Sequence, residues 1–216
     1  VYFIEYMNQK NGKNSLGLDS CFEDLDNPIE LFKNWFTKAE EKEINDPNAV
    51  AVATSDKHNQ PNVRMVLLKG LSDRGFVFYT NFNSKKGGEL KINQKASMCF
   101  HWKSLRRQVR VVGKVEEVTS KEADDYYSSR PYKNRISAWA SSQSQILDKR
   151  ETFLKKIKEY EKKYPDENNV PRPSHWSGWR LLPDEIEFWV DGEGRIHERL
   201  NYKNSNGKWV KEILYP

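Results

Sequence analysis

The chain has 216 residues, of which 37% are hydrophobic and 12% aromatic, so it is large enough for one domain with a substantial core. It carries 36 Lys and Arg against 31 Asp and Glu, and the resulting net charge of +5 suits an anionic ligand without singling out nucleic acid. Its apolar stretches are far shorter than the roughly 20 residues of a membrane helix, and no signal-peptide pattern opens the chain. We therefore expect a cytoplasmic protein with neither membrane nor nucleic-acid partners.

The first 25 residues are polar and aperiodic, which predicts a flexible arm over 1–25 followed by one domain over 26–216. Asn27 and Pro28 then supply a cap and a first-turn proline, and both are signals for the start of a helix. The apolar residues that recur at helical spacing behind this start are Ile29, Leu31, Phe32, Trp35, Phe36 and Ala39.

From residue 49 to residue 119 the apolar period changes to two, which indicates strands, and further strands close the chain. The expected strands are 49–55, 62–70, 75–80, 96–102, 108–118, 178–182, 185–190, 195–202 and 208–214. Helices are expected at 84–93, 121–129 and 148–164. A succession of antiparallel strands with helices at its margins predicts a mainly β protein built as a barrel.

Several reaction classes lack their signatures. The four histidines have no zinc-ligand spacing, so no metal site is expected, and no Walker loop, G-x-G-x-x-G or G-x-S-x-G occurs. Cys21 and Cys99 lie far apart and outside any C-x-x-C, which favours free thiols over a disulfide.

Ser84, Lys85 and Lys86 follow a strand and open a helix. Backbone N–H groups, a hydroxyl and two ammonium groups therefore converge there, as a phosphate site requires. The alternative is a capped helix with two solvated lysines.

Strand alternation places Arg195, His197 and Arg199 on one face. Neighbouring positive charges need a compensating anion or carboxylate, so we expect either a bound anion here or a solvated edge strand with acidic neighbours.

Two further pairs of residues have side chains that can bind anionic ligands. Arg64 and Lys69 face opposite sides of a regular strand, so they suit two different ligands. Tyr126 and Arg130 share a helix face, and a phenol with a guanidinium suits a phosphate monoester. The basic run 149–163 alternates with glutamates and is interpreted as a solvated helix face.

Together these segments resemble the pyridoxine/pyridoxamine 5′-phosphate oxidases, in the family's order and from about Asn27 to Pro216. The segments that carry the resemblance are Arg64-Met65-Val66-Leu67-Leu68-Lys69-Gly70, Phe78-Tyr79-Thr80-Asn81, Arg107-Gln108-Val109-Arg110-Val111, Tyr127-Ser128-Ser129-Arg130-Pro131, Ala138-Trp139-Ala140-Ser141-Ser142-Gln143-Ser144, Glu187-Phe188-Trp189 and Arg195-Ile196-His197-Glu198-Arg199. The resemblance implies an antiparallel FMN-binding split β-barrel that forms a homodimer, with FMN where the subunits meet.

The resemblance also assigns roles to residues. Those it implies for FMN binding are Arg64, Met65, Val66, Leu67, Leu68, Lys69, Tyr79, Thr80, Lys85, Lys86, Gln108, Gln143, Ser144, Trp189 and Arg199. Those it implies for substrate binding are Lys69, Tyr126, Arg130, Asn134, Arg195 and His197, of which Arg195 and His197 are also catalytic. It implies that Gln143 and Ser144 reach FMN from a different subunit than Arg64.

Three features depart from the family pattern: Lys85 replaces the usual Arg, Asn134 replaces the usual Ser, and the substrate lid is matched only by Glu5-Tyr6.

The implied function is FMN-dependent oxidation of pyridoxamine 5′-phosphate and pyridoxine 5′-phosphate by O2. The products are pyridoxal 5′-phosphate and hydrogen peroxide, with ammonia from the amine. One alternative is another split-barrel FMN oxidoreductase or flavin reductase. An alternative of another class is an anion- or nucleic-acid-binding module.

Overall fold

The computed structural model of the protein describes residues 12–216. The chain divides into two compact units, each built from separate segments. The first unit takes the chain up to Ala51 together with residues 97–113 and 183–216, and the second takes residues 52–96 and 114–182. Strands β1, β5, β6 and β7 each run through a boundary, so the division falls within strands rather than at a linker.

The helices are α2 (Pro28–Lys42), α3 (Lys85–Ile92), α4 (Ser120–Ser128), α5 (Tyr132–Ala140) and α6 (Arg150–Lys163), with a 3-10 turn η1 at Glu193–Arg195. The strands are β1 (Ala49–Ser55), β2 (Pro61–Leu67), β3 (Gly70–Ser72), β4 (Gly75–Asn81), β5 (Lys95–Trp102), β6 (Arg107–Glu117), β7 (Trp176–Val190), β8 (Glu198–Ser205) and β9 (Lys208–Ile213). Hydrogen bonds join them in the order β2-β1-β5-β6-β7-β4-β3, with β8 paired to β7 and β9 to β8. None of the helices within residues 12–216 combines the length and apolar character needed to span a membrane.

In the first unit, α2 begins where the sequence predicts. The Asn27 side chain accepts a hydrogen bond from the backbone N–H of Ile29 at 2.9 Å, and Pro28 occupies the first turn. The apolar face of the helix is buried, and the Trp35 ring lies 5.1 Å from that of Phe188 on β7. Burial of each large apolar side chain stabilises the unit by about 1.5–3 kcal/mol.

Residues 12–25 also pack onto the first unit, which corrects the prediction of a flexible arm for this stretch. Phe22 is fully buried, with its ring 5.4 Å from that of Trp35. The indole N–H of Trp35 donates to the carbonyl of Cys21 at 2.7 Å. The polar composition concealed this anchor because a single buried aromatic residue creates no periodicity. The predicted lid residues Glu5-Tyr6 lie outside the described residues.

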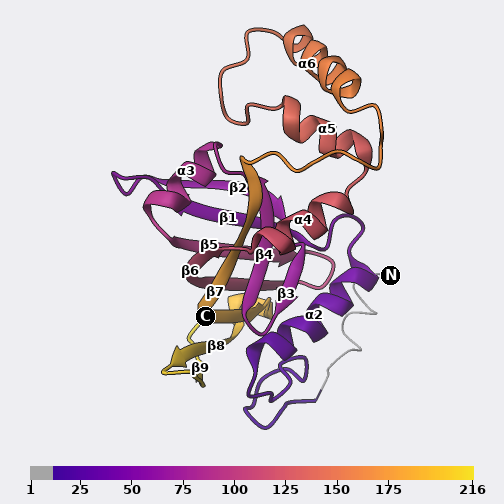
Figure 1. Ribbon diagram of the computed structural model, residues 1–216. Helices are drawn as coiled ribbons and strands as arrows, with labels where there is room; N and C mark the ends of the chain where they lie inside the picture. The colour runs from indigo at the N-terminus through magenta and orange to yellow at the C-terminus, as the bar shows by residue number, and fades with distance from the viewer. Residues whose placement is uncertain (1–11) are drawn as a thin grey trace. The chain divides into compact units, whose positions relative to one another are not determined.

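In the second unit, β4 lies between β7 and β3 and is buried at nearly every position. It pairs antiparallel with β3 and with the first half of β7, where Tyr79 lies opposite Gly178. A Cβ on Gly178 would come within 2.8 Å of the Tyr79 ring, so only glycine leaves room for this ring. Further along the chain, α5 and α6 pack side by side (Figure 1).

The predicted strand 62–70 is two strands, β2 and β3. The chain turns at Leu68 and Lys69, because β2 pairs with β1 whereas β3 pairs with β4. The backbone N–H of Lys69 donates to the carbonyl of Val77 at 2.8 Å and fixes this turn.

The predicted strands 178–182 and 185–190 are a single strand, β7. Pro183 lacks an N–H, but it falls between the segment of β7 that pairs with β4 and the segment that pairs with β8. The strand therefore continues through the proline without a lost hydrogen bond in either of these ladders.

Helix α5 was not predicted. It begins directly after Pro131, which occupies its N-cap position.

Candidate active site

A cavity of about 300 Å³ lies in the second unit, and most residues predicted to bind ligands in that unit line it. Its walls come from β2 and the turn after it, β4, the starts of α3 and β7, α4 with the residues that follow it, and the loop after α5. The lining residues are Met65, Val66, Leu67, Lys69, Tyr79, Thr80, Lys86, Tyr126, Arg130, Gln143 and Trp176.

Lys86 supplies a buried positive charge to this cavity. Lys86 is only 8% exposed. Its Nζ lies 2.9 Å from Thr80 Oγ1 and 3.0 Å from Gln143 Oε1, and both of these oxygens are neutral. Burial, aided by the charge of Arg64, lowers the pKa of Lys86 to about 8. Burial destabilises the charged form of Lys86, and an anion bound in the cavity would stabilise that form again.

The start of α3 fixes the position of Lys86. The Ser84 hydroxyl caps the helix by accepting from the backbone N–H of Gly87 at 3.3 Å. A Cβ at Gly87 would lie 2.5 Å from the carbonyl oxygen of Phe82, so glycine is required where the helix meets the preceding turn. Lys85, the neighbouring cation, is exposed, and its Nζ lies 2.9 Å from Asn62 Oδ1.

Arg64 does not line the cavity, and a carboxylate holds its guanidinium. Its Nη1 donates to Thr54 Oγ1 at 2.6 Å, and its Nη2 lies 3.3 Å from Glu89 Oε2. Glu89 is 4% exposed and also accepts from Asn62 Nδ2 at 2.7 Å. This network joins β1, β2 and α3 within the second unit, and through Asn62 it also reaches Lys85.

An aromatic stack forms the other wall of the cavity. The Tyr79 ring lies 4.1 Å from that of Tyr126 and 5.3 Å from that of Trp176, nearly parallel to both. The guanidinium of Arg130 lies 4.7 Å from the Trp176 ring, and its Nη1 is buried without a hydrogen-bond partner. A buried donor left unpaired is unfavourable, and because Arg130 lines the cavity, this atom is available to an acceptor on a ligand.

Some predicted site residues of the second unit do not line this cavity. Leu68 is buried, and Asn134 lies exposed in the first turn of α5. Ser144 has a left-handed backbone, φ 70°, and with Gln143 it lines a different cavity of about 470 Å³. Gln143 shares the first cavity with Met65 and Lys86 of its own chain.

In the first unit, the predicted row of Arg195, His197 and Arg199 on one strand is wrong. β8 begins at Glu198, and Arg195 lies in η1 with φ 65°, directly after Gly194 with φ 64°. Gly192 and Gly194, on either side of Glu193, permit a tight turn. The strand pattern expected from the sequence did not reveal this turn.

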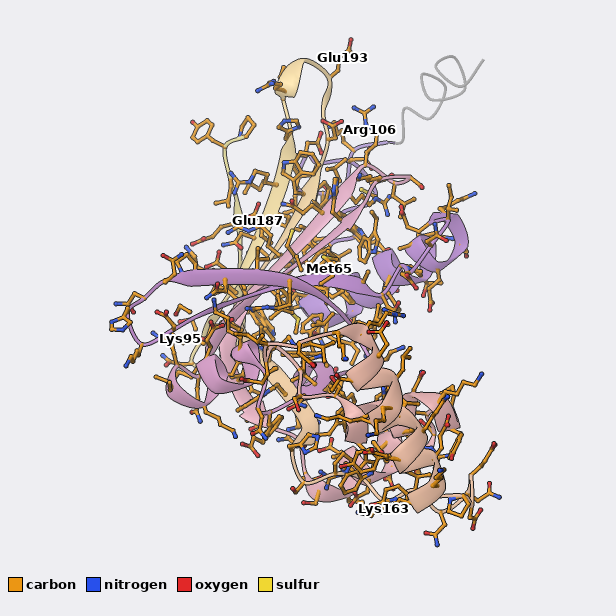
Figure 2. All side chains as sticks on the ribbon, turned by 90° about the horizontal axis from the view of Figure 1, so that it is seen from above. Met65, Lys95, Arg106, Lys163, Glu187 and Glu193 are labelled. Carbon is orange, nitrogen blue, oxygen red and sulfur yellow. The ribbon has the colours of Figure 1, made fainter. Side chains whose placement is uncertain are left out.

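Carboxylates lie beside Arg199 and His197. The expected solvated edge strand is wrong, because β8 pairs with β7 on one side and with β9 on the other. Glu187 is 5% exposed; its Oε1 accepts from Arg199 Nε at 2.9 Å, and its Oε2 accepts from Arg110 Nη1 at 3.0 Å. The hydrogen bond to Glu187 raises the pKa of Arg199. Figure 2 labels Glu187 on the strand and Glu193 at the tip of the loop that follows.

Trp189 and Gln108, the remaining predicted residues of this unit, lie half-buried on β7 and β6, and Trp189 pairs with Arg199 across the strands.

The comparisons with known proteins decide the family. Residues 36–164 match the family model described as pyridoxamine 5′-phosphate oxidase, and residues 176–216 match the pyridoxine 5′-phosphate oxidase C-terminal dimerisation region. The chain belongs to the pyridoxine/pyridoxamine 5′-phosphate oxidase family. A pyridoxine/pyridoxamine 5′-phosphate oxidase of Pelagibacter ubique is 61% identical over 207 residues, 95% of this chain and 100% of the relative. Its counterpart in Agrobacterium fabrum is 54% identical over 199 residues, 91% and 96% of the two chains.

Solved structures support the same family and fold. PhzG from Burkholderia lata 383, in complex with tetrahydrophenazine-1-carboxylic acid, matches with a TM-score of 0.85 at 28% identity, over 95% of this chain and 100% of that one. A pyridoxamine 5′-phosphate oxidase-related, FMN binding protein from Nostoc punctiforme shares the fold, with a TM-score of 0.69 at 16% identity over 86% and 97% of the chains. The predicted antiparallel split barrel of this oxidase family is confirmed.

Sequence reasoning missed the partners that hold the site together. Trp176 lines the cavity and stacks with Arg130, yet it lies far along the chain from the residues it contacts. Glu89 and Glu187 are buried beside arginines, and neither belongs to a motif that assigns it a partner. A glutamate at an inward position of a strand or helix was the available signal.

Proposed function

We propose that the protein oxidises pyridoxamine 5′-phosphate and pyridoxine 5′-phosphate with O2, using FMN, to pyridoxal 5′-phosphate and hydrogen peroxide. Three cations line this cavity, Lys69, Lys86 and Arg130. The observation that carries the proposal is that two of them present buried donors, the ammonium of Lys86 and the unpartnered Nη1 of Arg130. Two anionic groups, one on the cofactor and one on the substrate, match two separate cations. The names of the relatives supply the substrates.

The residues at the start of α3 fit the phosphate of FMN. Lys86 offers a charged donor whose present partners are neutral, and the exposed Lys85 adds a second cation. Arg64 adds positive charge nearby, as its effect on the pKa of Lys86 shows. When bound, FMN would supply the redox chemistry, taking a hydride equivalent from the substrate and passing electrons to O2.

The substrate phosphate is assigned to the other wall. Lys69 and Tyr126 line the cavity with no hydrogen-bond partner on their side-chain Nζ and OH among the described residues, and Arg130 presents its buried Nη1. A phenol, an ammonium and a guanidinium bind a phosphate through charge-assisted hydrogen bonds. The stack on Trp176 holds the Arg130 guanidinium in place, so less rotamer freedom is lost on binding.

Residues of the first unit complete the proposed chemistry. We assign Arg195 and His197 to the substrate ring, and Arg199 to the cofactor, where a fixed cation stabilises negative charge gathered during reduction. The match to the dimerisation region supports a homodimer as the active unit. A cytoplasmic location is part of the proposal, and the free thiols of Cys21 and Cys99 suit a reducing compartment.

Two measurements test the proposal, the flavin colour of the purified protein and then the formation of peroxide from the substrate. The purified protein is expected to be yellow and to release FMN on denaturation, and pyridoxamine 5′-phosphate is expected to elicit one peroxide per aldehyde formed. A colourless protein that binds no added FMN would contradict the cofactor assignment. A yellow protein that ignores both phosphorylated vitamers would leave another split-barrel flavin oxidoreductase as the better interpretation.

A further inference from the structure

His197 lies beside a carboxylate that no motif had singled out. The Nδ1 atom of His197 is 3.1 Å from Asp191 Oδ1, and the imidazole ring lies 4.7 Å from the Trp189 ring. Asp191 follows the end of β7, and His197 precedes β8, so the turn between the two strands brings the pair together.

Two neighbours of Nδ1 make opposite demands on it. The backbone N–H of Gly192 points at Nδ1 from 3.2 Å and needs a lone pair, whereas Asp191 Oδ1 needs a hydrogen. One nitrogen cannot satisfy both at once. A hydrogen bond to a charged carboxylate is stronger than one between neutral groups, so the carboxylate decides which form is held.

Arg106 keeps the Asp191 carboxylate in position. Its Nε donates to Asp191 Oδ2 at 2.7 Å, its Nη2 contacts the same oxygen, and its carbonyl accepts from the backbone N–H of Asp191 at 3.0 Å. The arginine thus occupies one carboxylate oxygen and leaves the other to His197. Figure 2 shows Arg106 nearer the strands than Glu193, which stands at the tip of the loop.

The rest of the loop is compatible with the contact between Asp191 and His197. A Cβ on Gly192 would lie 1.8 Å from the carbonyl oxygen of Ile196, so only glycine permits the turn to close. Glu198, the carboxylate next to His197 in the chain, is engaged elsewhere, by Lys13 and by the backbone N–H of Asp19. Asp191 is therefore the carboxylate that holds the ring.

We propose that Asp191, held by Arg106, is a positioning residue that keeps the hydrogen of neutral His197 on Nδ1 and leaves Nε2 with a free lone pair. His197 then meets the substrate as an acceptor through Nε2. This role in the reaction rests on the proposed function, in which His197 contacts the substrate, but the state of the ring is measurable without turnover.

Nitrogen NMR of the histidine-labelled, FMN-loaded protein tests the proposal, with the His197 signals assigned by their loss in His197→Asn. The expected result is a protonated Nδ1 and an unprotonated Nε2 in the neutral ring. In Asp191→Ala the Gly192 N–H is left as the neighbour, so the hydrogen is expected to move to Nε2. Glu193→Ala removes an exposed carboxylate two residues away and is expected to change nothing.

Kinetics complete the test. Asp191→Ala is expected to lower kcat for pyridoxamine 5′-phosphate about ten- to hundredfold, because a hydrogen on Nε2 removes the acceptor that faces the substrate. FMN affinity is expected to be unchanged, because the residues assigned to FMN are untouched. Should Asp191→Ala not fold, Asp191→Asn removes the same charge at nearly constant volume and takes its place. A hydrogen on Nε2 in the parent protein, or a tautomer that ignores Asp191, would overturn the proposal. So would a tautomer change without a change in kcat. The expected tautomers in a protein that oxidises neither vitamer would support the Asp191 contact and refute the proposed function instead.

Discussion

Lys86→Met is expected to weaken FMN binding about ten- to hundredfold. Methionine retains the apolar stem of lysine and removes the ammonium. A hydrogen bond to a charged group contributes about 1.5–3 kcal/mol, and 1.4 kcal/mol corresponds to a factor of about ten in affinity. Because Lys86 is only 8% exposed, solvent screens little of this contribution.

Lys85→Met is the matched control. Lys85 is the adjacent cation, but it is exposed and already hydrogen-bonded to Asn62, so its loss should weaken FMN only a few-fold. Fluorescence titration of the cofactor-free protein measures both variants. If Lys85→Met proves the more damaging, Lys86 is not the direct phosphate ligand and the phosphate site has to be reassigned.

The pH dependence gives an independent signature of Lys86. With a pKa of about 8 in the free protein, Lys86 loses its charge above that pH, so FMN affinity should fall there by up to about tenfold per pH unit. The Lys86→Met variant should lack this fall. Without FMN, the unfolded chain binds more protons between about pH 8 and the ordinary lysine value of 10.5, so the free energy of unfolding should rise with pH over that window.

Three further outcomes are expected. Arg130→Leu should weaken pyridoxamine 5′-phosphate about ten- to hundredfold with FMN retained, and equal turnover of unphosphorylated pyridoxamine by the parent protein would contradict a phosphate role. Lys85→Arg should tighten FMN by about 0.5–1.5 kcal/mol, since a guanidinium offers two parallel donors; an unchanged titration would remove Lys85 from the site. Arg199→Gln should lower flavin affinity or slow flavin reduction, and if stopped-flow shows both unaltered the assignment of Arg199 is wrong.

Elements with short-range signals were predictable from the sequence. Asn27 caps the start of α2, and Ser84 caps the start of α3. Each cap residue lies within three residues of the helix start that it determines. The alternation of buried and exposed residues along β6 likewise depends on neighbours in the chain. These predictions succeeded because local backbone chemistry decides them.

Features that depend on distant partners were not predictable. Nothing near Pro183 reveals that β7 changes partner there, and only the two ladders explain why the strand continues. In α5, the buried Arg135 interrupts the apolar pattern, and its backbone carbonyl accepts from the Tyr127 hydroxyl at 2.9 Å. The helical period was therefore hidden by tertiary contacts.

The candidate site was likewise predictable only in part. Motifs in the sequence indicated Lys86, Tyr126 and Arg130, and these three residues do line one cavity. Their partners came only from the fold, among them Trp176 under Arg130 and Asp191 beside His197. The segment 195–199 shows why: a left-handed residue at Arg195 ends the alternation that the sequence had implied.

Anaerobic mixing of the FMN-loaded protein with pyridoxamine 5′-phosphate tests the central claim most directly, because it observes the redox step without oxygen or coupling enzymes. The account predicts that the visible flavin absorption bleaches in one turnover and that pyridoxal 5′-phosphate appears in equal amount. Admission of air should restore the yellow colour with one peroxide per flavin. A flavin that stays oxidised with both phosphorylated vitamers would contradict the account.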